Sequence, residues 1–74
     1  MNVEKFNNQN GNSYVILALN SNRTALLCKI AGFEAAASFV VCKELNFESH
    51  DWYHGAYFDD FEEAYNYYRR IVKD

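Results

Sequence analysis

The chain has 74 residues, of which 10 are acidic and 7 basic, and its formal net charge at pH 7 is −3. This length predicts a single domain over residues 1–74, whose small core depends on its six Phe, six Tyr and one Trp. The acidic balance argues against direct nucleic-acid binding, and the longest apolar run, at 14–19, is far shorter than the ~20 residues that span a membrane.

The first part of the chain predicts a polar arm followed by a β-hairpin. Residues 1–12 are rich in asparagine, and only Val3 and Phe6 could anchor them, so we expect a flexible arm or an edge piece there. Apolar residues dominate 13–19 and 24–30, and each run is typical of a strand covered on both faces. Residues 20–23, between these runs, include two asparagines, whose side chains are suited to closing an Asx turn. The two runs therefore predict a hairpin.

The middle of the chain allows two interpretations. Its apolar residues fit a helical period over 31–40, and the alanines in this stretch favour a short helix. The β-branched and aromatic residues that follow favour a strand instead. We expect a loop over 31–37 and a strand over 38–45, with the short helix as the alternative. A further short strand is expected over 52–58, where Gly55 allows a bulge.

The last element predicted is an amphipathic helix over 60–72. Asp59 is the expected N-cap, and Glu62 three residues later forms an Asp variant of the capping box. Apolar side chains recur at helical spacing and predict one buried stripe: Phe61, Ala64, Tyr65, Tyr68, Ile71 and Val72.

Together these elements predict an α+β fold, in which an antiparallel sheet of three to four strands carries one C-terminal helix on one face. The other face is too apolar to be wholly exposed to water, because the strands have apolar residues at both parities. The N-terminal arm, a second copy of the chain or a target protein could cover this face. A homodimer is the first choice, since two-fold pairing is the commonest solution.

The C-terminal half matches one pattern: Trp52-x-x-Gly55-x-Tyr57-Phe58, then Asp59, then Ala64 in the helix. This pattern resembles a class of small proteins encoded by phages and mobile elements, in which a strand of this type leads into a C-terminal helix. That class includes inhibitors of bacterial defence such as anti-CRISPR proteins. The resemblance implies a protein partner, such as a CRISPR-Cas or other defence nuclease, and it carries no residue roles over to this chain.

Candidate metal and thiol chemistry has simpler structural explanations. His50 and His54 flank Asp51, but a Zn²⁺ ion would need further ligands brought from afar, such as Cys42. Cys28 and Cys42 lie inside apolar runs, which is typical of reduced thiols in a cytoplasmic protein. We therefore expect free thiols, no bound metal or cofactor, and a cytoplasmic location.

The polar side of the predicted helix is the candidate partner-binding surface. Its acids would suit a basic channel, and exposed Tyr and Arg are enriched at protein interfaces. The candidate residues are Asp59, Asp60, Glu62, Glu63, Tyr67 and Arg70. We expect a non-enzymatic inhibitor that occludes a nuclease or its nucleic-acid-binding surface. Two alternatives stay open: a structural or regulatory homodimer without an inhibitory role, and a small metal-dependent enzyme.

Overall fold

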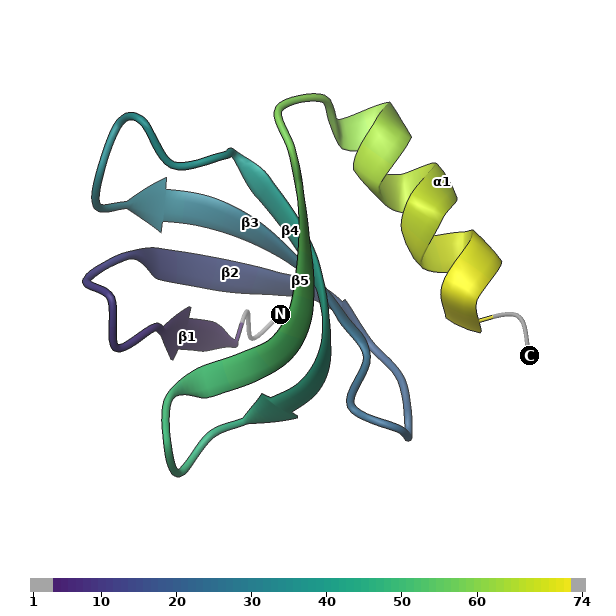
Figure 1. Ribbon diagram of the computed structural model, residues 1–74, viewed down its shortest axis with the longest axis horizontal. Coiled ribbons are helices and arrows are strands. Elements are labelled where there is room, and N and C mark those ends of the chain that lie inside the picture. The colour runs from purple at the N-terminus through teal and green to yellow at the C-terminus, as the bar shows by residue number, and fades with distance from the viewer. Residues whose placement is uncertain (1–3, 73–74) are drawn as a thin grey trace.

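The computed structural model describes residues 4–72 as five strands followed by one helix (Figure 1). The elements are β1 Lys5–Asn7, β2 Ser13–Leu19, β3 Ala25–Ala31, β4 Phe39–Asn46, β5 Asp51–Phe58 and α1 Phe61–Val72. The strands form one antiparallel sheet in the order β1-β2-β3-β4-β5. The α+β class with one C-terminal helix is confirmed. The sheet has five strands, however, and not the expected three to four.

The additional strand is β1, which lies in the segment predicted as a flexible arm. Phe6 of β1 pairs with Tyr14 of β2, and only 2% of the Phe6 side chain is exposed. For residues 5–7 the prediction of a loose arm is therefore wrong and the alternative, an edge piece anchored by Phe6, is confirmed. Residues 1–3 of the expected arm lie outside the described part of the chain.

Asparagine side chains close the first two turns. In the turn between β1 and β2, the backbone N–H of Asn10 donates to Oδ1 of Asn8 at 2.9 Å. In the turn between β2 and β3, Oδ1 of Asn20 accepts from the backbone N–H groups of Asn22 and Thr24 at 3.0 and 2.8 Å. The Asx turn predicted within residues 20–23 is confirmed, and Asn20 is the residue that closes it. The asparagines of the expected arm have the same function one hairpin earlier.

The ambiguous segment between β3 and β4 is a loop without a helix. Nζ of Lys29 donates to the backbone carbonyl oxygens of Phe33 and Ala36, the second at 2.8 Å. These bonds hold the loop against the end of β3. Among the two interpretations of 31–45, the structure therefore confirms the loop followed by a strand.

The sheet face opposite α1 is filled because the sheet curls on itself. Phe6 of β1 and Trp52 of β5 come from opposite edges of the sheet, yet their ring centroids lie 5.9 Å apart. The backbone N–H of Gln9 also donates to the carbonyl oxygen of His50 at 3.0 Å. The enclosed side chains form an inner core of Phe6, Tyr14, Ala25, Leu27, Val40, Cys42 and Leu45. The N-terminal segment thus helps to cover this face, which removes the basis of the homodimer prediction there.

Two bulges bend the β4–β5 pair and so produce the curl. The register between the strands shifts once between Val41 and Lys43 and again between Lys43 and Asn46. Each bulge contains a residue with left-handed backbone: His54 in β5, with φ 50°, and Glu44 in β4, with φ 53°. Bulges of this kind increase the local twist of a strand. His54, considered above as a metal ligand, therefore has a structural reason to be where it is.

Helix α1 lies on the outer face of the sheet, against β3, β4 and β5 (Figure 1). Ala64 and Tyr68 are buried, at 0% and 8% exposure, in an outer core with Leu26 and Val41. Two members of the predicted stripe depart from it, because Phe61 and Tyr65 are 47% and 41% exposed. No helix within residues 4–72 has the length and apolar character to cross a membrane.

Candidate interaction surface

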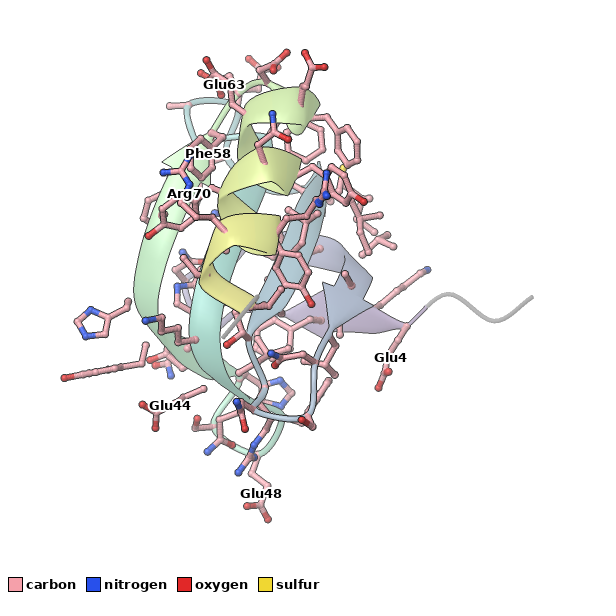
Figure 2. The ribbon with its side chains drawn as sticks, turned by 90° about the vertical axis from the view of Figure 1, so that its right-hand side faces the viewer. Glu4, Glu44, Glu48, Phe58, Glu63 and Arg70 are labelled. Atoms are coloured by element: carbon pink, nitrogen blue, oxygen red, sulfur yellow. The ribbon has the colours of Figure 1, made fainter. Side chains whose placement is uncertain are left out.

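Four exposed carboxylates gather where α1 begins, at the top of Figure 2. Oδ2 of Asp60 accepts a hydrogen bond from the backbone N–H of Glu63 at 3.0 Å, so Asp60 is the N-cap. Oδ1 of Asp59 instead accepts from the backbone N–H of Ser38 at 3.4 Å, which joins this turn to the loop before β4. The cap predicted at Asp59 with Glu62 is therefore wrong by one residue, because α1 starts one position later.

Glu63, Tyr67 and Arg70 follow the flank of α1 that faces β5, since they are spaced by four and three residues. Figure 2 shows Glu63, Phe58 and Arg70 on this side of the helix. The Tyr67 side chain is half-buried, and its ring centroid lies 5.4 Å from that of Phe58. The prediction that Tyr67 faces outward is therefore wrong.

A hollow of about 320 Å³ opens beside Tyr67, between α1 and the bulged part of β5. We call it the β5-side hollow, and it is lined by Lys43, His54, Gly55, Ala56, Tyr67 and Ile71. It combines an aromatic and an aliphatic wall with two nitrogen-bearing side chains. Because the hollow is open at the surface, it suits a side chain of a partner better than a substrate that must be shielded from water.

The opposite flank of α1 carries side chains that the sequence did not single out as functional. The rings of Phe61 and Tyr65 are stacked, with centroids 5.7 Å apart, and Cζ of Arg69 lies 5.6 Å from the Tyr65 centroid. Phe61 also meets Phe39 of β4 edge to face at 5.6 Å. These contacts leave much of Phe61 and Tyr65 open to solvent.

This aromatic flank continues over the outer face of β2 and β3. Among the described residues α1 contacts β3, β4 and β5 and leaves β2 uncovered. Val15 is paired with Cys28, and Cys28 with Phe39, so the three share the outer face. Leu17 and Ile30 are the unpaired residues at the two bulges of the β2–β3 pair, one on each side of this row, and they are 46% and 50% exposed. We call this surface the outer strip: Val15, Leu17, Cys28, Ile30, Phe39, Phe61 and Tyr65.

The spacing of the Trp52-x-x-Gly55-x-Tyr57 pattern has a packing explanation. A Cβ atom at position 55 would lie 2.7 Å from the hydroxyl oxygen of Tyr57 and 2.8 Å from Nε1 of Trp52. Trp52 in turn packs on the inner core, with its ring centroid 5.4 Å from that of Tyr14. Glycine at position 55 therefore leaves room for the side chains of Trp52 and Tyr57 to pack over the backbone of the bulge. The pattern by itself assigns no binding role to these two residues.

The two thiols lie on different faces of the sheet. Both are free: Cys42 is buried in the inner core and Cys28 is half-buried on the outer strip. Burial raises the pKa of the Cys42 thiol to about 12. Within residues 4–72 there is no group of three or more His, Cys, Asp or Glu side chains that could hold a metal ion. The complete burial of Cys42 in the inner core gives it a packing role.

We expect the Cys42 thiol to make the fold sensitive to alkali. Its pKa is raised from 9.0 to about 12 by the fold, so the stability that the neutral thiol contributes is complete below pH 9 and is lost as the pH rises from 9 toward 12. The loss approaches about 1.4 kcal/mol per pH unit. Urea unfolding at several pH values should show a shallower loss for Cys42→Ala than for Cys28→Ala. Equal slopes for the two variants would contradict this prediction.

The molecule thus presents two different surfaces on the two flanks of α1, and the six predicted residues are not one cluster. Glu63, Tyr67 and Arg70 share the β5 side, and the other three carboxylates lie at or before the first turn. The outer strip was missed because Phe61 and Tyr65 have the spacing of core residues. No family model, no curated protein and no solved structure matches this chain, so its resemblance to phage-encoded inhibitors stays a prediction.

Proposed function

We propose that this protein is a non-catalytic protein-binding module, and that its target contacts the β5 flank of α1. The β5-side hollow carries this proposal, because it lies beside the charged side chains that a partner would meet first. Tyr67 and Ile71 give the hollow an apolar wall, and Glu63 and Arg70 are exposed on the same flank. Tyr, which lines the hollow, and Arg, which is exposed on the same flank, are residue types that often dominate binding energy.

The charges favour a target with a basic surface. Four exposed carboxylates occupy the start of α1, and the whole chain is acidic. A basic channel that binds nucleic acid attracts such a group of negative charges before contact and holds it after contact. We therefore propose a cytoplasmic inhibitor that occludes such a channel. Because the C-terminal half resembles phage-encoded proteins, a bacterial defence nuclease is the first class of target to test.

Charge reversal at Glu63 should weaken target binding at least about tenfold, since an attractive contact becomes repulsive. The target is captured on the immobilised protein from a bacterial lysate and identified by mass spectrometry. Its affinity for the purified variants and its nucleic-acid binding in their presence are then measured.

Glu48→Lys is the matched control for Glu63→Lys. It changes the net charge by the same amount, and Glu48 lies at the opposite end of the molecule from Glu63 (Figure 2). We expect the wild type and Glu48→Lys to block nucleic-acid binding by the target, and Glu63→Lys to block it poorly. Equal loss in both variants, or binding that leaves the nucleic-acid channel free, would contradict the proposal.

A further inference from the structure

The outer strip is a second surface that the contact at the β5 flank leaves unoccupied. Its four most exposed side chains present about 370 Å² of surface, taking about 200 Å² for a whole side chain of this size: Leu17, Ile30, Phe61 and Tyr65. Contiguous apolar patches of this size on a monomer are often functional. A stable interface buries about 800 Å² on each partner, so this strip could supply its apolar centre.

The strip is continuous from the sheet to the helix. Val15, Cys28 and Phe39 are neighbours across β2, β3 and β4, and the edge-to-face contact of Phe39 with Phe61 joins this row to α1. The aromatic stack of Phe61 and Tyr65 then extends along the helix. Since these contacts hold the rings in place, little side-chain freedom would be lost when a partner docks.

The charged side chains beside the strip, Glu62 and Arg69, indicate which partner is complementary to it. Glu62 lies in the first turn of α1 and Arg69 in the last turn, and the seven-residue spacing places both on one side of the helix, about 10.5 Å apart along its axis. Arg69 is directed along the strip by its position over the Tyr65 ring. Each copy thus has Glu62 at one end of the helical part of the strip and Arg69 at the other end.

We propose that the outer strip binds a second copy of this chain through an antiparallel pairing of the two α1 helices. A two-fold axis near Tyr65 places Arg69 of each copy opposite Glu62 of the other, and it also sets the oppositely signed ends of the helix dipoles side by side. The exposed rings and the aliphatic side chains of β2 and β3 then form the centre of the interface. This contact does not depend on the proposed target, because the β5 flank stays free on both copies.

Charge reversal tests the pairing through its symmetry. The wild type should sediment as a dimer at high micromolar concentration. Glu62→Arg alone and Arg69→Glu alone should each raise the dimer dissociation constant at least about tenfold, because like charges then meet at two equivalent places. An equimolar mixture of the two variants should dimerise again, since each then supplies the charge that the other lacks.

Arg70→Glu is the control, because this neighbour of Arg69 lies on the β5 side of α1 and should leave the dimer intact. A wild type that stays monomeric overturns the proposal, as does a mixture of Glu62→Arg and Arg69→Glu that stays monomeric while both variants keep the circular dichroism of the wild type. Target binding is measured separately with Glu63→Lys, so failure of the dimer and failure of the proposed function give different results.

Discussion

Replacing Phe6 with alanine should lower the free energy of unfolding by about 3–5 kcal/mol, the usual cost of removing a buried aromatic ring. Only 2% of the side chain is exposed, and its ring contacts those of Phe47 and Trp52, with centroids 5.7 and 5.9 Å away. A domain of this length has a total stability of roughly 4–11 kcal/mol. The variant should therefore be close to unfolding at room temperature.

Urea unfolding followed by the fluorescence of Trp52, the single tryptophan, measures this loss. Lys5→Ala is the matched control in the same short strand, because Lys5 is exposed and its replacement should change the stability by no more than about 0.5 kcal/mol. If Phe6→Ala were as stable as Lys5→Ala, the N-terminal segment would be the loose arm that the sequence predicts.

Strands and turns with a local signal were predicted well. The strand expected over 13–19 has the same bounds in the structure, because a dense apolar run is bounded by polar turn residues. Asn20 closes the next turn through its own side chain, which is a property of that residue alone. The C-terminal helix was likewise evident from its period, and only its cap, at Asp60, was displaced by one residue.

Strand β1 could be predicted only as the alternative to a loose arm, an edge piece anchored by Phe6, because nothing local stabilises it. It has three residues, of which only Phe6 is apolar, and it exists because it pairs with β2 while the Phe6 ring meets Trp52 from the other edge of the sheet. That meeting depends on the bulges at Glu44 and His54. Gly55 indicates the bulge in β5, whereas nothing at Glu44 indicates the one in β4. The covering of the inner face followed from this curl.

The same long-range geometry decides which side of the helix is buried. Six aromatic and aliphatic residues had the spacing of a core stripe, but the twisted sheet meets α1 closer to Tyr67 than to Phe61. Tyr67 therefore packs on Phe58, whereas Tyr65 becomes a surface residue under Arg69. Helical period alone places residues on one face, and only the sheet register selects which face turns inward. Both candidate surfaces depend on that selection.

Replacing Gly32 with alanine should cost about 3 kcal/mol or more, because two separate penalties combine at this position. Its backbone has φ 124°, which side chains other than hydrogen rarely allow, and an added Cβ would lie 2.8 Å from Cα of Asn12. Asn12 is 3% exposed, and its Oδ1 accepts a hydrogen bond from the N–H of Phe33 at 2.8 Å. The clash therefore displaces a buried side chain that links the β1–β2 turn to the β3–β4 loop.

Gly11→Ala separates the two penalties at Gly32. Gly11 also has a left-handed backbone, with φ 101°, but the atom nearest to an added Cβ is a ring carbon of the exposed Phe33, at 3.4 Å. We expect Gly11→Ala to lose about 1–2 kcal/mol, the backbone cost alone, and Gly32→Ala to lose clearly more in thermal or urea unfolding. Equal losses of stability in the two variants would show that the Asn12 side chain moves aside at no cost in free energy. In that case the bond from Phe33 to Asn12 would contribute little to holding the two loops together.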